Sequence, residues 1–169
     1  MTGAPTMLES PVGPLTVATS DAGITHLVFG RREIAEPATS AALRWLDLVR
    51  RELAAYFDGR LRTFTVPADL ERVTGERRAI LDALDGVGYG ETTSYGALAA
   101  AAGLDGDGAR RVGAAMARNP VAIVVPCHRV IGADGSLTGY GGGLAAKRWL
   151  LDLEAAQPSD RPGQLALPL

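Results

Sequence analysis

The pattern of apolar and polar positions divides the chain into two regions of different character. In the first region, short apolar runs at residues 15–18 and 24–29 are separated by the turn-forming sequence Ser-Asp-Ala-Gly. Two runs of this length on either side of such a turn predict a β-hairpin. Residues 61–66 are predicted to return as a further strand.

Between these strands, apolar residues recur every three or four positions, the period of an α-helix with one buried face. They are Leu43, Leu46, Val49, Leu53 and Phe57. Thr39 or Ser40 can cap the start of this helix, and Gly59 can end it. The aromatic residues of this region are interpreted as core rather than site residues, and they are Trp45, Tyr56 and Phe57.

A second, mainly helical region begins near Thr74, which can cap a helix that ends at the glycines of residues 86–90. The apolar residues on one side of this helix are Ile80, Leu81 and Leu84. We therefore divide the chain into three parts. They are an N-terminal α/β lobe over residues 1–72, a second lobe over residues 73–156, and a flexible tail over residues 157–169.

Two short helices across a glycine-rich turn are predicted next, over residues 95–102, capped by Ser94, and from residue 109 to about residue 118. This pair resembles a helix-turn-helix. On the outward face of the second helix, small side chains alternate with cations, so that this helix can approach a DNA duplex closely. The residues assigned to this face are Arg110, Arg111, Gly113, Ala114, Ala115 and Arg118.

Charge and composition narrow the classes of function. The 169 residues carry a formal net charge of −2, so the chain as a whole does not attract a polyanion. Residues 109–133 nevertheless contain four arginines, among them Arg129, and no Asp or Glu, which predicts either a local DNA-binding surface or an accidental basic face. Apolar runs are too short to span a bilayer, and the N-terminus has no signal-peptide pattern, so we expect a soluble cytoplasmic protein with no membrane partner.

The chemistry centres on one cysteine. Cys127, His26 and His128 are too few for an internal disulfide or a Cys/His zinc site. A lone cysteine beside an apolar run can be a buried small hydrophobe. His128 and Arg129, however, follow it directly and supply a base and a positive potential, which lower a thiol pKa. Adjacent side chains rarely bond directly, so we expect His128 to act through a water, with its imidazole oriented by Glu154 on a helix over residues 144–154.

Residues 90–154 resemble the 6-O-alkylguanine-DNA alkyltransferases, which repair DNA by direct reversal. The motifs that carry the resemblance are Gly-Glu-Thr-Thr-Ser-Tyr at 90–95, Asn-Pro at 119–120, Pro-Cys-His-Arg-Val at 126–130, Gly-Tyr-Gly-Gly-Gly at 139–143, Lys147 and Glu154. Residues 1–66 match only in pattern. The resemblance implies an α/β (α+β) fold, with a small ribonuclease-H-like N-terminal lobe and a helical C-terminal lobe that contains a helix-turn-helix.

The resemblance also implies the reaction. Cys127 would accept an alkyl group, once and irreversibly, from the exocyclic oxygen of guanine or, more weakly, of thymine in DNA. His128 and Glu154 would form a water-linked relay that removes the thiol proton. Asn119 would brace the turn that holds the site, and Arg110 would fill the gap that the rotated-out nucleotide leaves.

The remaining implied roles concern the extruded base. The Tyr95 hydroxyl would donate to a ring nitrogen, the Gly141 N–H would point at the exocyclic oxygen, and the carbonyls of Cys127 and Val130 would accept from the exocyclic amine. Tyr140 would line the pocket. Lys147 is also assigned to the substrate-binding residues. Alternatively, it is an ordinary solvated charge on its helix.

The implied partner is double-stranded DNA that contains alkylated guanine, bound by a monomer that uses no metal and no cofactor. Two alternatives remain. One is a sensor that flips the alkylated base without transferring anything, against which Cys127 argues. The other is a cysteine hydrolase that uses Cys127, His128 and Glu154 on a small substrate and turns over many times.

The end of the chain suggests a second partner. It resembles the Gln-Leu-x-Leu-x-Leu motif with which bacterial proteins dock onto the replicative sliding clamp, and a tail that packs on its own protein is the alternative. The residues concerned are Gln164, Leu165, Ala166, Leu167, Pro168 and Leu169.

Overall fold

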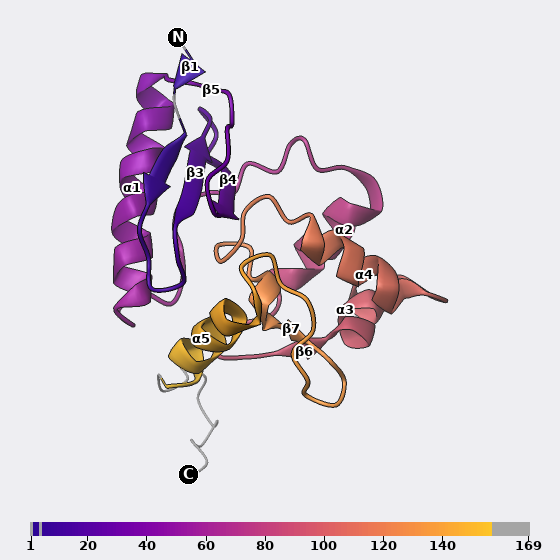
Figure 1. Ribbon diagram of the computed structural model, residues 1–169. Helices are drawn as coiled ribbons and strands as arrows, with labels where there is room; N and C mark the ends of the chain where they lie inside the picture. Colours follow the sequence, from indigo (N-terminus) through magenta and orange to yellow (C-terminus); the bar gives the residue numbers. More distant parts are fainter. Residues whose placement is uncertain (1, 4, 157–169) are drawn as a thin grey trace.

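The computed structural model describes residues 2, 3 and 5–156, and its N-terminal part is a small antiparallel sheet beside one long helix (Figure 1). The sheet has the strand order β2-β3-β4, with these bounds: β2 (Thr6–Leu8), β3 (Leu15–Thr19) and β4 (Ile24–Phe29). Two short strands pair with each other, β1 (Thr2–Gly3) and β5 (Glu36–Pro37). The predicted hairpin is confirmed, because β3 and β4 pair antiparallel and the Ser20 N–H donates to the Gly23 carbonyl across the turn at 2.8 Å.

The long helix α1 (Ser40–Phe57) packs against β3 and β4. Its start is capped as predicted, because the Thr39 hydroxyl accepts a hydrogen bond from the Ala42 N–H at 3.0 Å. The expectation that Leu43 faces inward is wrong, since this side chain is 52% exposed. Ala42 takes the inward position, because it lies seven residues, close to two helical turns, before the buried Val49.

The strand predicted over residues 61–66 is absent from the structure, and a carboxylate takes the place of a strand partner. Glu52 of α1 is buried and accepts hydrogen bonds from the Thr65 N–H at 2.9 Å, the Val66 N–H at 3.1 Å and the Thr65 hydroxyl. These bonds satisfy backbone groups that would otherwise need a neighbouring strand. Only after this point does the chain meet the sheet, at an isolated bridge between Ala68 and Ile24.

The C-terminal part is mainly helical, as predicted. Its helices are α2 (Gly75–Leu84), α3 (Tyr95–Ala101), α4 (Gly108–Ala117) and α5 (Leu144–Ala155). The Ser94 hydroxyl caps α3 by accepting from the Ala97 N–H at 3.0 Å, whereas the Thr74 side chain makes no such bond to α2. Helices α3 and α4 pack against each other across a short turn, which is the arrangement of the expected helix-turn-helix (Figure 1).

Three short elements of the C-terminal part were not predicted, and they lie around the cysteine. A 3-10 helix, η1, spans Cys127–Arg129 and leads directly into β7 (Val130–Ile131). The third element, β6 (Thr93–Ser94), pairs with β7 in parallel and runs into the start of α3. This pairing fixes the start of α3 beside η1.

Hydrogen bonds across the two parts place the cysteine segment against the N-terminal sheet. The Leu27 N–H donates to the Pro120 carbonyl at 2.8 Å, and the Ala122 N–H donates to the Leu27 carbonyl at 2.9 Å. Residues 120–122 therefore extend the sheet as a short parallel neighbour of β4, and Val121 is fully buried there. Within the described residues, the helices are all too short or too polar to cross a membrane.

Candidate functional site

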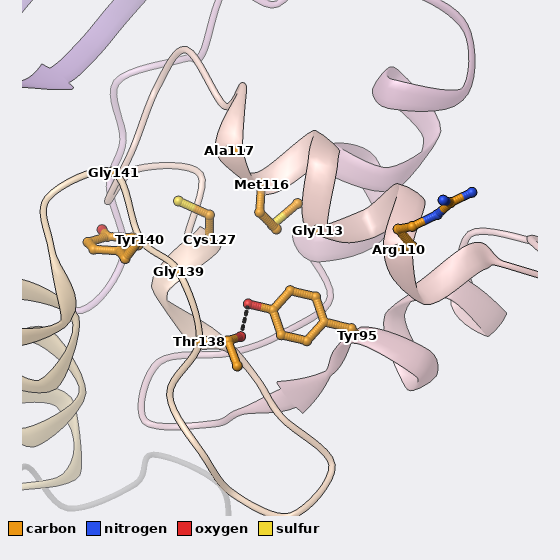
Figure 2. Close-up of a pocket in the computed structure, with 10 residues that line it drawn as sticks. All are labelled: Tyr95, Arg110, Gly113, Met116, Ala117, Cys127, Thr138, Gly139, Tyr140 and Gly141. Carbon is orange, nitrogen blue, oxygen red and sulfur yellow. Dashed lines mark hydrogen bonds between the residues drawn. The ribbon is translucent and has the colours of Figure 1, made fainter.

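Cys127 lies on the wall of a cavity of about 580 Å³ between α3, α4 and the loop that precedes α5 (Figure 2). Its residue is only 5% exposed, so the thiol is reached through this cavity rather than from the open surface. The cavity is lined by Tyr95, Arg110, Gly113, Met116, Ala117, Cys127, Thr138, Gly139, Tyr140 and Gly141. The structure thus brings together residues from four segments that the sequence analysis assigned to one site: α3, α4, η1 and the loop before α5.

The turn that leads into Cys127 is held by Asn119. Its side-chain N–H donates to the Val125 carbonyl at 2.9 Å, and its side-chain oxygen accepts from the Val121 N–H at 3.0 Å. Inside this turn, Ile123 has a φ of 70°, which is a strained conformation for a β-branched residue. The two Asn119 bonds span the strained residue, which is the bracing position expected for this side chain.

Behind Cys127, the carboxylate of Glu154 is fully surrounded by donors. Its Oε1 accepts from the Tyr56 hydroxyl at 2.7 Å, from Arg129 at 2.9 Å and from His128 Nε2 at 2.8 Å. Its Oε2 accepts from Arg129 Nε at 2.9 Å and from the Gly90 N–H at 3.3 Å. The expected contact between His128 and Glu154 is therefore present in the structure.

The electrostatics of this cluster assign its protonation states. Burial opposes ionisation of Glu154, but hydrogen bonds from His128 and Arg129 outweigh it and lower the pKa of Glu154 to about 2. Burial also lowers the pKa of His128, although Glu154 acts in the opposite direction. His128 is therefore neutral near pH 7, and its Nε2 carries the proton because Glu154 can only accept. Nδ1 of His128 is buried and has no protein partner within the described residues.

The expected cause of thiol activation needs a correction. Arg129 makes its ion pair with Glu154 and donates to the Val87 carbonyl at 2.7 Å, so its charge is directed away from the sulfur. Burial raises the pKa of the Cys127 thiol, and Asn119, the positive charge of Lys147 and Tyr140 act in the opposite direction. The resting thiol is therefore protonated.

Lys147 is not a solvated helix charge, because it is only 1% exposed. Its Nζ donates to the Thr138 carbonyl at 3.1 Å and lies 5.8 Å from the ring centre of Tyr95 and 6.0 Å from that of Tyr140. A buried ammonium is stabilised by a carbonyl and by two aromatic faces. Neither Lys147 nor the fully buried Val130 is among the residues that line the cavity around Cys127. Lys147 supports the two tyrosines from behind.

The polar groups that face the cavity come from Tyr95 and from the loop before α5. The Thr138 hydroxyl donates to the Tyr95 hydroxyl at 2.8 Å, which leaves the proton of Tyr95 free to donate elsewhere (Figure 2). Tyr140 lies beside the sulfur, and burial, followed by the charge of Cys127, raises the pKa of Tyr140 well above its ordinary value. Gly141 also lines the cavity, as expected.

The outward face of α4 is less basic than the sequence suggested. Arg110 lies at the edge of the cavity, but its side chain is 84% exposed, and its guanidinium points outward and pairs with Asp107 (Figure 2). Arg111 pairs with Glu76 and Asp107, so carboxylates from outside residues 109–133 neutralise it. Ala115, expected on this face, is buried. The residues that do remain on the outer side are Gly113, which also lines the cavity, and the exposed Ala114 and Arg118.

Two family descriptions match most of the chain. Residues 5–70 match "6-O-methylguanine DNA methyltransferase, ribonuclease-like domain", and residues 76–156 match "6-O-methylguanine DNA methyltransferase, DNA binding domain". The chain belongs to this methyltransferase family. The resemblance and the mixed α/β fold inferred from the sequence are thereby confirmed.

Members of this methyltransferase family are similar to the chain over nearly its whole length. The chain is 43% identical over 160 residues to the methylated-DNA–protein-cysteine methyltransferase of Mycobacterium tuberculosis (strain ATCC 25618 / H37Rv), covering 90% of this chain and 93% of that protein. It is 40% identical over 156 residues to the protein of the same name from Methanosarcina barkeri, covering 88% and 94%. A crystal structure of Mycobacterium tuberculosis OGT in complex with DNA is similar with a TM-score of 0.78 and 43% identity, covering 89% and 91%.

The sequence analysis of this methyltransferase gave no site role to Tyr56 or to Thr138, whose hydroxyl donates to Tyr95. Tyr56 was assigned to the core, and it is fully buried, but its hydroxyl donates to Glu154 across 98 positions of the chain. The role of Tyr56 could have been suspected from its side chain, because a tyrosine on the buried face of a helix needs a hydrogen-bond partner for its hydroxyl. The periodicity could not identify that partner.

The buried carboxylate makes the stability of this methyltransferase depend on pH. Because the pKa of folded Glu154 is lowered from 4.5 to about 2, its contribution is fully present above pH 4.5 and is lost as the pH falls towards 2. Glu154→Gln should lower the free energy of unfolding by about 3 kcal/mol near neutral pH. This difference should shrink steadily between about pH 4.5 and about pH 2, as measured by urea unfolding.

Asp152→Asn is the matched control, since Asp152 is an exposed carboxylate on the same helix. It should unfold like the unmodified protein at every pH. A Glu154→Gln difference that stays constant from neutral to acid pH would contradict the assignment of an ionised Glu154.

Proposed function

We propose that Cys127 accepts the alkyl group from the exocyclic oxygen of guanine in DNA, once per protein molecule, so that the protein repairs DNA by direct reversal. The observation that carries this proposal is the position of the cysteine. It is the single cysteine of the sequence, and it lies on a cavity between the DNA-binding helix α4 and a histidine relay. The family's reaction, alkyl transfer to a cysteine, therefore has one residue on which to occur.

The geometry supports a relay that removes the thiol proton. Neutral His128 donates from Nε2 to Glu154 and keeps Nδ1 as a basic lone pair. A water between Nδ1 and Sγ passes the thiol proton to the imidazole. The charged imidazolium then lies against an ionised carboxylate that five hydrogen bonds hold in place. The positive charge that forms on His128 is therefore stabilised by a group that is already in position. Asn119 braces the turn from which Cys127 enters this relay.

The thiolate then displaces guanine from the alkyl carbon. A sulfur–carbon bond forms as the carbon–oxygen bond breaks, and the electron pair leaves with the guanine oxygen. The Tyr95 hydroxyl donates to a ring nitrogen and the Gly141 N–H to the exocyclic oxygen, while the Cys127 carbonyl accepts from the exocyclic amine. The buried Val130 carbonyl, assigned to the same amine from the sequence, lies outside the cavity lining. Tyr140 forms one wall of the cavity. The thioether has no good leaving group, so the protein is not regenerated.

The base reaches Cys127 only after it is rotated out of the duplex. Arg110 is placed to occupy the gap, because it extends from α4 away from the cavity and into the space where DNA would lie. Gly113 and Ala114 allow the helix to approach the duplex closely, and Arg118 contacts the phosphate backbone. Thymine with an alkylated exocyclic oxygen is a weaker substrate of the same site.

The wider organisation of the protein follows from this role. We propose that residues 1–72 form the structural lobe and that residues 73–156 bind DNA and carry the acceptor. The protein acts as a monomer in the cytoplasm, where its thiol stays reduced. It requires no metal or cofactor, because the relay and the sulfur supply all the groups of the reaction.

Cys127→Ser should abolish alkyl transfer, because a serine hydroxyl is not ionised under conditions in which a thiol can be. Mass spectrometry after incubation with a duplex containing methylated guanine should show one added methyl group on Cys127, and no addition to the variant. Binding of the variant to the same duplex should be retained. Repair by the variant at the normal rate would contradict the proposal.

The same experiment separates the two alternatives. A base-flipping sensor would bind the duplex and leave Cys127 unmodified. A cysteine hydrolase would release many product molecules for each protein molecule. The proposed reaction instead stops when the amount of repaired guanine equals the amount of protein.

Arg110→Ala should slow repair of duplex DNA by about tenfold or more, because nothing then fills the gap behind the rotated-out nucleotide. Transfer from the free alkylated base, which needs no rotation, should be little changed. The rates of both reactions are measured by transfer of a labelled alkyl group. Arg50→Ala, which removes an exposed arginine from α1, is the control and should affect neither rate. Equal losses with both substrates would contradict the role of Arg110.

A second partner is proposed for the tail, which lies outside the described residues. Residues 164–169 match the pattern of a peptide that docks onto the sliding clamp, and three spaced leucines can fill apolar pockets of such a ring. Deletion of these six residues should abolish binding to the clamp in calorimetry and leave alkyl transfer intact. Replacing Leu165 and Leu167 by alanine should have the same effect at full chain length. Clamp binding that survives both changes would refute the idea.

A further inference from the structure

The cavity at Cys127 continues beyond the sulfur towards the N-terminal sheet. A second hollow of about 300 Å³, which we call the β4 arm, is lined on one side by the β4 residues Leu27, Val28 and Phe29 and by Arg32, which follows this strand. On the other side it is lined by residues that also line the main cavity, and these are Met116, Ala117, Cys127, Tyr140 and Gly141. Cys127 therefore borders both the main cavity and the β4 arm.

Phe29 forms a tight contact in this arm with the glycine-rich loop. A Cβ atom added to Gly142 would lie 2.6 Å from two atoms of the Phe29 ring, far inside van der Waals contact. The backbone of the loop thus rests directly on the ring face. Gly142 is required here for lack of space, since its backbone is not in the left-handed region.

The same ring also positions Tyr140. The ring centres of Phe29 and Tyr140 are 5.2 Å apart in an edge-to-face arrangement, with an angle of 68° between the planes. Tyr140 in turn lies beside the Cys127 sulfur. One aromatic side chain from the N-terminal sheet therefore sets the position of both the loop backbone and the tyrosine that border the acceptor sulfur.

We propose that Phe29 is a specificity-determining residue, which limits the size of the alkyl group that can be transferred to Cys127. This inference rests on the proposed alkyl transfer. The reacting carbon must lie in line between the sulfur and the guanine oxygen, so any further carbons of the alkyl group need room beside the sulfur. The β4 arm borders the sulfur, and the Phe29 ring, with the loop and Tyr140 held against it, restricts its width.

The test compares two substrates, duplexes that carry either a methyl or a benzyl group on the exocyclic oxygen of guanine. Phe29→Ala should raise the ratio of the benzyl to the methyl transfer rate by about tenfold or more, the size expected when a pocket gains space for several carbons. Phe29→Leu should raise the ratio less, and it keeps the test valid if the alanine variant folds poorly. An unchanged ratio in both variants would overturn the proposal.

Two further variants separate specificity from stability. Leu46→Ala removes a partly buried apolar side chain from α1, away from the cavity, and should leave the ratio unchanged. Gly142→Ala should slow both transfers because its Cβ collides with Phe29, and adding Phe29→Ala should restore a part of the lost rate. If the rate loss of the double variant is only the sum of the losses of the two single variants, the contact between residues 142 and 29 is not the cause.

Failure of this inference can be distinguished from failure of the proposed function. If Phe29 does not affect the ratio, methyl transfer to Cys127 still proceeds in every variant that folds. If the proposed function itself fails, no alkyl group appears on Cys127 in the unmodified protein.

Discussion

The buried carboxylate of Glu154 is the interaction on which the rest of the structure depends. A lone buried charge would be strongly unfavourable, and here it is compensated by hydrogen bonds from Tyr56, Gly90, His128 and Arg129. These donors come from the N-terminal helix, the segment before α3 and η1. Satisfying this one carboxylate therefore fixes four distant segments relative to one another, and it sets the tautomer of His128, which follows Cys127.

The N-terminal sheet and helix contribute more to the geometry of the site around Cys127 than their lack of reactive groups suggests. The edge strand of the sheet hydrogen-bonds the segment that leads to the cysteine through Leu27, the helix supplies Tyr56 to the relay, and Phe29 supports the glycine-rich loop. Each contact is made by an apolar or aromatic residue or by backbone. The Cys127 thiol, the proposed acceptor, is thus held by the second part of the molecule and positioned by the first.

Electrostatic attraction accounts for little of the expected contact with DNA. The net charge is −2, Arg111 is paired with carboxylates, and Arg129 is buried against Glu154. The exposed cations of this face are Arg110 and Arg118, beside the small side chains of α4. In the proposed reaction, close approach of the helix and accommodation of the rotated-out base in the cavity would therefore contribute more to recognition than the long-range field does.

The sequence alone determined the local features: the hairpin, the helices, the caps at Thr39 and Ser94, and the motifs from Gly90 to Glu154 that identify the family. These depend on neighbours within one or two helical turns or on contiguous motifs. Tertiary structure decided which groups meet at long range. In the folded protein, Thr65 and Val66 bond to the Glu52 carboxylate instead of to a neighbouring strand. Lys147 is buried against the rings of two tyrosines, and the Tyr56 hydroxyl reaches Glu154. Periodicity specifies which face of an element is buried, but the partner of a buried polar group depends on segments that are distant in the chain.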